Sequence, residues 1–144
     1  WRQYIFDLLI SMPPRPYASE VIHLLRKAGH KIVILSARDN QYLTNQYEGM
    51  MAYYVRSWLA KNNIEYDDLI INSKNKREKC LELGFDIMIE DKASNVNSIS
   101  KIIPVMVFDA PYNQGCTGSN VIRVYSWYQV YQEILNKFAA IELI

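Results

Sequence analysis

The sequence has few cysteines, little net charge and no long apolar run. Its two cysteines, Cys80 and Cys116, have neither the spacing of metal ligands nor the number needed for a disulfide framework, so we expect a reducing, cytoplasmic location. A formal net charge of +1 is too small to indicate a nucleic-acid or membrane-surface partner. The apolar runs at 32–35 and 105–108 are far too short to span a bilayer, and no secretory signal is visible.

What is present is the composition of a soluble globular protein. The chain has 144 residues, of which 50% are hydrophobic and 22% are charged, and this suits one domain with a substantial core. Three prolines between residues 13 and 16 end any helix that precedes them. We therefore expect the compact domain to occupy residues 16–144, with residues 1–15 as a linker or as the end of another element.

Helical and strand-like patterns alternate along the chain. Apolar residues at 18, 21, 22 and 25 form one helix face, which Gly29 is placed to end. The apolar run at 31–35 predicts a strand that is buried on both faces. Further strands are predicted at 69–71, 86–89, 104–108 and, as an edge strand, 121–124, and further helices at 47–59, 76–83, 96–99 and 127–138. This alternation predicts an α/β fold with a three-layer, Rossmann-like parallel sheet and helices on both faces.

The predicted strands all end in polar or charged residues. The ends of parallel strands share one edge of a sheet, where ligands bind. These strand ends include Ser36, Asp109 and the pair Glu90 and Asp91, and Lys76 begins a helix after the second strand. Hydroxyl and ammonium groups hold phosphate oxygens, and carboxylates hold Mg²⁺. The set therefore suits a phosphate together with a divalent cation.

Each of these residues also has a purely structural interpretation. Ser36 could cap the loop that follows it. Lys76 could be a solvated lysine in the first turn of a helix, although a cation is slightly unfavourable there. One of the acids Glu90 and Asp91 could be the N-cap of the next helix. Asp109 precedes a turn-like segment, and for this residue we favour the structural role.

Three segments resemble signatures of the haloacid-dehalogenase-like hydrolase superfamily. The strand that ends in Ser36, Ala37 and Arg38 is similar to the second signature of that superfamily, a strand ending in Ser or Thr. Lys76, at the start of a helix, resembles the third. The fourth signature is an acidic strand end that binds metal, and it is similar to 85–91 with Asn95. The segments 13–16 and 108–113 further resemble the 5′(3′)-deoxyribonucleotidase-like branch.

The resemblance implies a Mg²⁺-dependent phosphohydrolase that acts on a small phosphorylated substrate. In that case Ser36, with Ala37 and Arg38, would bind the phosphoryl group. Lys76 would neutralise the phosphoryl group and position the nucleophile. The metal residues would be Asp91 with Glu90 and Asn95. Catalytic roles would fall to Ser36, Lys76 and Asp91, in a two-step displacement through an aspartyl-phosphate.

One signature of that family is missing from the chain. The nucleophile belongs to a central strand that ends in Asp-x-Asp, and no such pair is present: Leu9 stands two residues after Asp7, and 67–68 precedes a strand. The sequence also begins at Trp1 rather than at Met. We therefore expect the central strand, with a helical cap that ends within residues 1–15, to come from upstream residues or from another chain, and we expect the 144 residues alone to be inactive.

Other interpretations stay open at this point. A catalytically inactive module that binds phosphate or a nucleotide, or that regulates a partner, is the main alternative, and an unrelated interaction domain is a third. Tyr17, Tyr42 or Tyr112 could stack on a base. The helix that carries Trp58 could contribute to the core or to an interface between copies, so a homo-oligomer is also open.

Overall fold

The structure is a computed structural model of the 144-residue chain, and it describes residues 13–36, 48–71 and 75–142. Helices and strands alternate in these residues, and every described strand pair is parallel. The predicted α/β class, with parallel sheets flanked by helices, is confirmed. Residues 1–74 and 75–144 form two compact units, and the predicted domain start at residue 16 stays a prediction. None of the helices in the described ranges could cross a bilayer.

The first unit begins with the amphipathic helix α2 (Ala18–Lys27), as the apolar spacing predicts. The apolar side chains at 18, 21, 22 and 25, on one face of the helix, are buried. The helix ends in a Schellman motif, because Gly29 N–H donates to the carbonyl of Arg26 and His30 N–H donates to that of Leu25, both at 3.0 Å. Gly29 has a positive φ of 97°, which a residue without a Cβ adopts at little cost.

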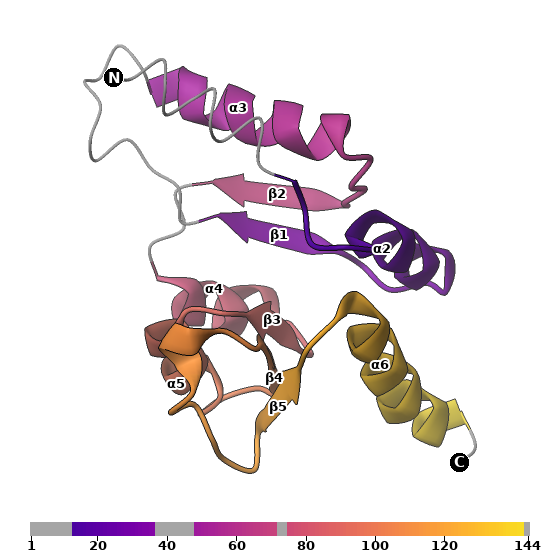
Figure 1. Ribbon diagram of the computed structural model, residues 1–144, viewed down its shortest axis with the longest axis vertical. Coiled ribbons are helices and arrows are strands. Elements are labelled where there is room, and N and C mark those ends of the chain that lie inside the picture. Colours follow the sequence, from indigo (N-terminus) through magenta and orange to yellow (C-terminus); the bar gives the residue numbers. More distant parts are fainter. Residues whose placement is uncertain (1–12, 37–47, 72–74, 143–144) are drawn as a thin grey trace. The chain divides into compact units, whose positions relative to one another are not determined.

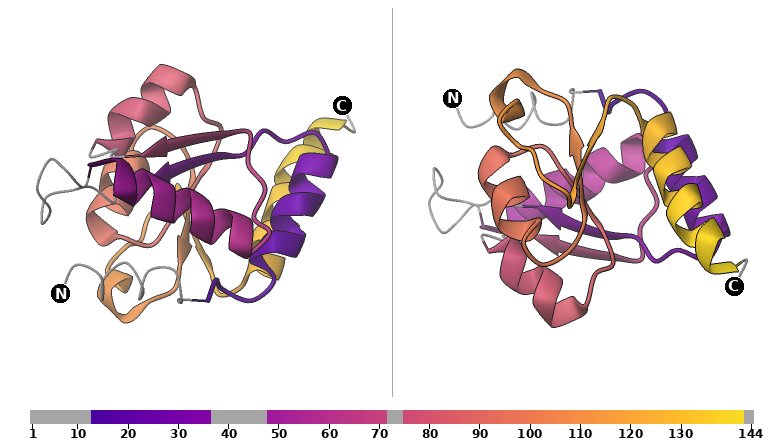
Figure 2. Two further views of the ribbon diagram at one scale, coloured as in Figure 1. Left: turned by 90° about the horizontal axis from the view of Figure 1, so that it is seen from above. Right: turned by 90° about the horizontal axis from the view of Figure 1, so that it is seen from below.

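A β-α-β segment completes the first unit. Strand β1 (Val33–Ser36) pairs in parallel with β2 (Asp68–Ile71), and helix α3 (Glu48–Lys61) connects them. Figure 1 and Figure 2 show α3 running back alongside the two strands. The register places Ser36 opposite Ile71, so both residues lie at the carboxyl end of the pair.

The second unit contains a three-stranded parallel sheet (Figure 1). Its strands are β3 (Met88–Glu90), β4 (Val105–Phe108) and β5 (Val121–Val124), in the order β3-β4-β5. Within the described residues β5 is an edge strand, as predicted for 121–124. The other elements are α4 (Lys76–Leu83), α5 (Ala93–Ile99), the short 3₁₀ helix η2 (Pro111–Asn113) and α6 (Trp127–Glu142).

Apolar packing in the second unit fixes the position of the strand ends. Helix α4 packs against α5, and α5 packs against β3 and β4. All four residues of β4 are buried, and Val96 and Ile99 on α5 are fully buried in the same core as Val105 and Val107. The core holds the carboxyl end of β3 beside that of β4 and close to the start of α5.

The strand β1 is less buried than the sequence predicts. Its four residues are half-buried, whereas an apolar strand covered on both faces would be fully buried, as β4 is. In the described part of the chain β4 lies between two strands, while β1 pairs with β2 alone. One edge of β1 and one edge of β3 therefore carry no partner strand within the described residues.

Candidate phosphate and cation site

Ser36 is the last residue of β1 and lies at the carboxyl end of the first sheet, half-buried. The other residues expected to bind substrate there, Ala37 and Arg38, lie outside the described residues, as does Tyr42. Ser36 belongs to the first unit, whereas Lys76 and Asp91 belong to the second. Their convergence on one rim stays a prediction.

Lys76 and Glu90 form an ion pair in the second unit. Lys76 begins α4, and Glu90 is the last residue of β3. The Lys76 Nζ lies 3.0 Å from the Glu90 Oε2, and the two side chains are only 12% and 6% exposed. The interpretation of Lys76 as a solvated lysine is therefore wrong, because its ammonium group is largely removed from water and is paired with a carboxylate.

The Glu90 carboxylate has three further donors. Its Oε1 accepts the main-chain N–H groups of Asp91 and Lys92, each at 3.1 Å. Its Oε2 also accepts the side-chain amide of Asn95 at 3.3 Å. Buried ions persist only when their oxygens and protons are satisfied in this way. The network fixes Lys76, Glu90 and Asn95 relative to one another.

A buried cysteine lies beside this ion pair. Cys80, one turn after Lys76 on α4, is 1% exposed. Burial raises the pKa of the Cys80 thiol, the charge of Lys76 acts in the opposite direction, and the charge of Glu90 raises the pKa further. The thiol therefore stays protonated at neutral pH and is part of the apolar core rather than a nucleophile.

Asp91 is half-buried and is held at two points. Its Oδ2 accepts the hydroxyl of Tyr112, and its main-chain carbonyl accepts the side-chain amide of Asn113 at 2.8 Å. The alternative interpretation, in which one of the two acids is the N-cap of α5, is not observed. The N-cap of α5 is Lys92, which makes no side-chain capping bond, and Glu90 accepts the N–H groups of the two residues that precede the helix.

Asn113, which was not among the predicted site residues, connects all three strands of this sheet. Its amide donates to the carbonyls of Asp91 and, at 2.7 Å, Phe108, which follow β3 and end β4. Its Oδ1 accepts the N–H of Ala110 at 3.1 Å and the guanidinium of Arg123, on β5, at 2.9 Å. The residue is 0% exposed. In the sequence Asn113 is only an asparagine within a turn-forming segment, and asparagines are common in turns.

Asp109 has a structural role, as expected. Its Oδ1 accepts bonds from Arg123 and from the side-chain amide of Gln114, both at 2.9 Å. The Arg123 guanidinium also donates to the main-chain carbonyls of Asn113 and Cys116. The carboxylate of Asp109 therefore helps to hold the loop after β4 against β5.

The donor set at the end of β3 fits Mg²⁺ in kind. Mg²⁺ prefers carboxylate and amide oxygens, and Asp91, Glu90 and Asn95 supply these. Both oxygens of Glu90 already accept protein donors, whereas the Oδ1 of Asp91 has no protein partner within the described ranges. The residues that the structure describes contain no group of three or more His, Cys, Asp or Glu side chains arranged around one metal position.

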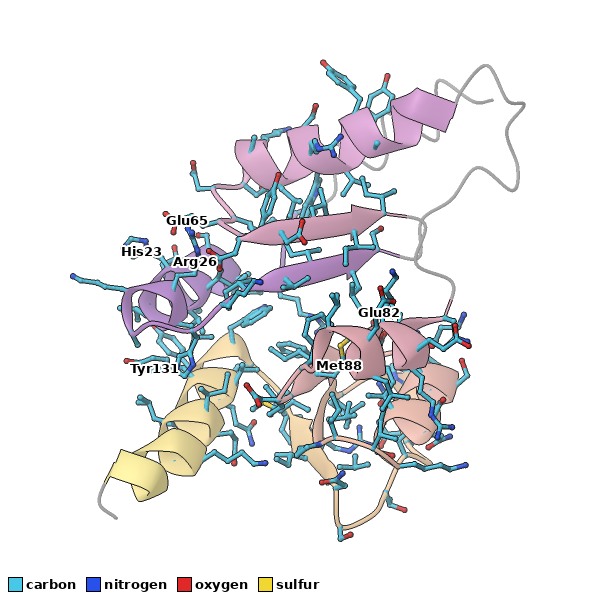
Figure 3. All side chains as sticks on the ribbon, turned by 180° about the vertical axis from the view of Figure 1, so that it is seen from behind. His23, Arg26, Glu65, Glu82, Met88 and Tyr131 are labelled. Carbon is cyan, nitrogen blue, oxygen red and sulfur yellow. The ribbon has the colours of Figure 1, made fainter. Side chains whose placement is uncertain are left out.

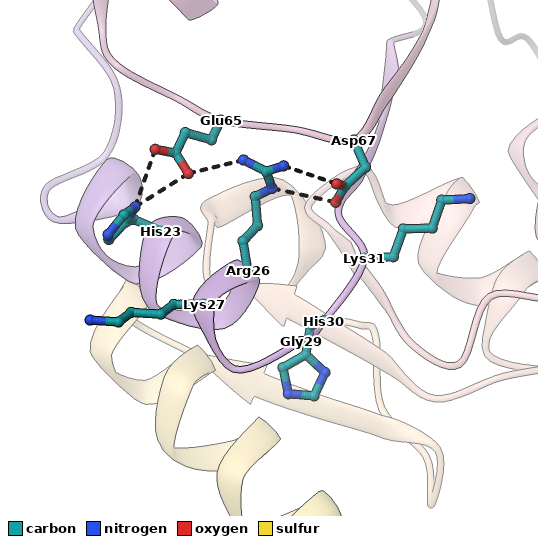
Figure 4. A pocket seen from close by; sticks show the side chains of 8 residues that line it. All are labelled: His23, Arg26, Lys27, Gly29, His30, Lys31, Glu65 and Asp67. Atoms are coloured by element: carbon teal, nitrogen blue, oxygen red, sulfur yellow. Dashed lines mark hydrogen bonds and ion pairs between the residues drawn. The ribbon is translucent and has the colours of Figure 1, made fainter.

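A second charged cluster lies at the amino ends of β1 and β2 (Figure 3, Figure 4). Arg26 donates to Asp67 at 2.9 Å and to Glu65 at 3.0 Å, and Glu65 also bonds His23 at 3.1 Å. The Asp67 carboxylate accepts the N–H of Ile32 at 2.7 Å. The cluster therefore fixes α2 to the start of both strands.

These contacts shift the pKa values of the charged groups. Hydrogen bonds from His23 and Arg26 hold the pKa of Glu65 below its ordinary value. Hydrogen bonds from Arg26 and from the Ile32 main chain lower the pKa of Asp67, and the bonds to Asp67 and Glu65 raise the pKa of Arg26.

A shallow pocket at this cluster is lined by charged residues, but they do not converge on a ligand. Figure 4 shows the side chains of Lys27 and Lys31 pointing away from each other, and the charge of Arg26 is neutralised by two acids. The pocket also lies at the amino ends of the strands, whereas ligands of parallel sheets bind at the carboxyl ends. The carboxyl end of β3 is the better candidate site.

Comparison with known proteins identifies the family. Residues 2–140 match the family described as 5′ nucleotidase, deoxy (pyrimidine), cytosolic type C protein. The chain belongs to this family. The predicted resemblance to haloacid-dehalogenase-like nucleotidases is therefore confirmed, and it extends over almost the whole chain.

Individual relatives agree with this assignment. The chain is 31% identical over 123 residues to the putative nucleotidase YqfW of Bacillus subtilis. The matched region covers 83% of this chain and 58% of that protein. It is 32% identical over 110 residues to the nucleotidase CA_C3379 of Clostridium acetobutylicum, and this match covers 74% of this chain and 57% of that protein. The chain thus spans a little over half the length of these curated relatives.

Proposed function

We propose that the protein in which this chain occurs is a Mg²⁺-dependent phosphohydrolase of the nucleotidase type, acting on nucleoside monophosphates in the cytoplasm. The observation that carries the proposal is the buried Lys76–Glu90 pair next to Asp91 at the carboxyl end of β3. A protein rarely removes a lysine and a glutamate from water unless the pair is needed. Membership of a nucleotidase family supports a role for these charges in binding a phosphoryl group and a metal ion.

Each residue then has a defined part. Ser36, with Ala37 and Arg38, would hydrogen-bond the phosphoryl oxygens, and Lys76 would offset the negative charge that develops on them. Asp91 would be the direct metal residue, because its Oδ1 has no protein partner among the residues that the structure describes. A bound Mg²⁺ would supply further positive charge at the transferring phosphoryl group.

Glu90 and Asn95 would support this site. Their side chains bond each other, and Glu90 also holds the Lys76 ammonium. We propose that they fix the direction of Lys76 and the position of Asp91, and that they contribute to the metal site in this way. This arrangement matches the general pattern in which partners of the ligating residues orient the ligands.

The attacking carboxylate would come from a segment outside the described residues. One edge of β1 and one edge of β3 have no partner strand in the described part of the chain. Unpaired strand edges are costly when they are buried. We propose that a strand ending in Asp-x-Asp, from upstream residues or from another chain, pairs at these edges and supplies the nucleophile for an aspartyl-phosphate intermediate.

The test is hydrolysis of p-nitrophenyl phosphate and of a panel of nucleoside monophosphates, in Mg²⁺ or in EDTA. We expect no turnover from the 144-residue chain and Mg²⁺-dependent turnover from a version that is extended upstream. In the extended version Lys76→Met should lower kcat by about 10²- to 10³-fold, and Asp91→Asn should abolish the response to Mg²⁺.

Matched controls come from the same elements. Lys79→Met, also on α4, removes a lysine whose exposed pair with Glu82 serves no proposed function, and Asp86→Asn removes an exposed acid near β3. Both should leave kcat unchanged. Nucleotide binding without turnover in the extended version would instead support the alternative of an inactive binding module. Turnover by the 144-residue chain that is lost in Asp7→Asn would overturn the proposed source of the nucleophile.

A further inference from the structure

The η2 turn, residues 111–113, touches Asp91 from two adjacent positions. Tyr112 donates its hydroxyl to the Asp91 carboxylate, and Asn113 donates its amide to the Asp91 main-chain carbonyl. Asp91 follows β3 and the turn follows β4. These are neighbouring strands in one sheet, so both contacts come from the same compact unit.

The side-chain amide of Asn113 makes every hydrogen bond that it can make. A primary amide has two N–H donors and two acceptor lone pairs, and Asn113 uses all four: two main-chain carbonyls accept from it, and a main-chain N–H and Arg123 donate to it. With no exposed surface, the side chain has a single orientation. It fixes the main chain at Asp91 relative to the end of β4.

Tyr112 acts on the other part of Asp91. Its hydroxyl bonds the Oδ2, and hydrogen bonds to a charged carboxylate are among the stronger ones in proteins. The contact selects one orientation of the carboxylate. It also uses one lone pair of Oδ2, whereas Oδ1 accepts no protein donor within the described residues and is the freer oxygen for another ligand.

We propose that the η2 turn is a positioning element for the cation site, in which Tyr112 orients the Asp91 carboxylate so that it binds a divalent cation through Oδ1 alone. Asn113 provides the fixed main chain against which Tyr112 acts. The inference rests on the proposed function, since it takes Asp91 as the metal residue. It adds a residue to the metal site from a turn for which the sequence predicts no metal-binding role.

Tyr112 allows a test that separates positioning from folding. The residue is 61% exposed, so Tyr112→Phe removes the hydroxyl and leaves the packing intact. Surface substitutions of this kind change stability little. The matched control is Tyr125→Phe, because Tyr125 is also exposed, at 66%, and its hydroxyl makes no described contact.

The experiment measures Mn²⁺ binding to the full-length protein by electron paramagnetic resonance, with Mg²⁺ as the competitor. We expect Tyr112→Phe to raise the Kd of both ions about tenfold and to keep the Tm of the unchanged protein. In assays, the Mg²⁺ concentration for half-maximal activity should rise by the same factor, while kcat at saturating Mg²⁺ stays nearly constant. Tyr125→Phe should change neither quantity.

The outcomes distinguish this inference from the proposed function. If Asp91→Asn weakens Mn²⁺ binding and Tyr112→Phe behaves like Tyr125→Phe, the inference is overturned and the proposed function stands. If Asp91→Asn binds Mn²⁺ as tightly as the unchanged protein, Asp91 is not the metal residue, and both fail. A Tyr112→Phe protein with a lowered Tm and an unchanged Kd would show a structural role and would also overturn the inference.

Discussion

The chain contains two charged networks that differ in burial and in position. The network around Arg26 joins α2 to the amino ends of β1 and β2, and its side chains are between 31% and 58% exposed. The pair of Lys76 and Glu90 lies at the carboxyl end of β3, with side chains 12% and 6% exposed. Both contain short ion pairs, so distance alone does not tell them apart.

The difference shows which network is costly to maintain. An exposed ion pair contributes little to stability, since water solvates each charge almost as well as the partner does. A buried pair has lost that water and depends on its partner and on the surrounding hydrogen bonds. Burial of charge at the carboxyl end of a parallel strand therefore indicates a functional site, whereas exposed pairs at the amino ends are more simply structural.

The largest expected effect is that of Glu90→Gln. The substitution keeps the shape of the side chain and leaves the Lys76 ammonium without a counter-charge in a site that is only slightly exposed. We expect a loss of about 3 kcal/mol in the free energy of unfolding, measured by denaturant titration. Glu82→Gln, which breaks the exposed pair with Lys79, is the control. Equal losses in the two proteins would remove the contrast between buried and exposed pairs.

Asn113→Ala should have the next largest effect. It removes an amide that makes four hydrogen bonds in a fully buried position, and it leaves main-chain groups and Arg123 without that partner. We expect a loss of about 2 kcal/mol in the free energy of unfolding. The control is Asn120→Ala. Asn120 is partly exposed, and its amide donates one described bond, to the carbonyl of Ser100. If Asn113→Ala were about as stable as the unchanged protein, loss of a buried, hydrogen-bonded amide would not be destabilising in this protein.

Arg26→Met should have a smaller effect that depends on salt. Arg26 is exposed enough for water to replace much of what Glu65 and Asp67 provide. We expect a small decrease in Tm at low ionic strength and almost none at 1 M salt, where charges are strongly screened. The control is Lys27→Met, an exposed neighbour on the same helix without a described ion pair. A large decrease that persists in high salt would mean that this network resembles the buried one.

The smallest effect should be the pH dependence of the Arg26 contribution. The pKa values of Glu65 and Asp67 are lowered in the folded protein, so the unfolded chain binds more protons near pH 4, and stability rises with pH there. The contribution is fully present above the ordinary carboxyl range and is lost as the pH falls through the lowered values. The Tm difference between the unchanged protein and Arg26→Met should therefore shrink below about pH 4. A constant difference from pH 7 to pH 3 would contradict the cause given for these shifts.

The order and type of the elements were predictable from the sequence. Short β-branched runs gave the strands, apolar spacing gave the helices, and the helix at 76–83 has the predicted bounds. Lys76, Glu90 and Asp91 were also predicted site residues, because strand ends and helix starts can be located from periodicity. The degree of burial of β1 was not predictable, since it depends on how many strands pair with it, which lies outside the local pattern.

The partners within the site were not predictable either. The sequence could not show which of the two adjacent acids holds Lys76, because a strand ending in Glu90 or in Asp91 fits the same pattern. Residue Asn113 was missed for a related reason. Its importance comes from contacts with residues 91, 108 and 123, and these are brought together by the sheet and not by sequence spacing.

The two cysteines of the chain provide a natural probe of its motions. Cys80 and Cys116 both lie in the core of the second unit, at 1% and 2% exposure, and the first unit contains none. An alkylating reagent can reach either sulfur only when that core opens. The rate of native-state labelling would therefore measure the opening free energy of residues 75–144 by themselves, without an added label, and would show whether substrate or metal makes this part of the protein open less often.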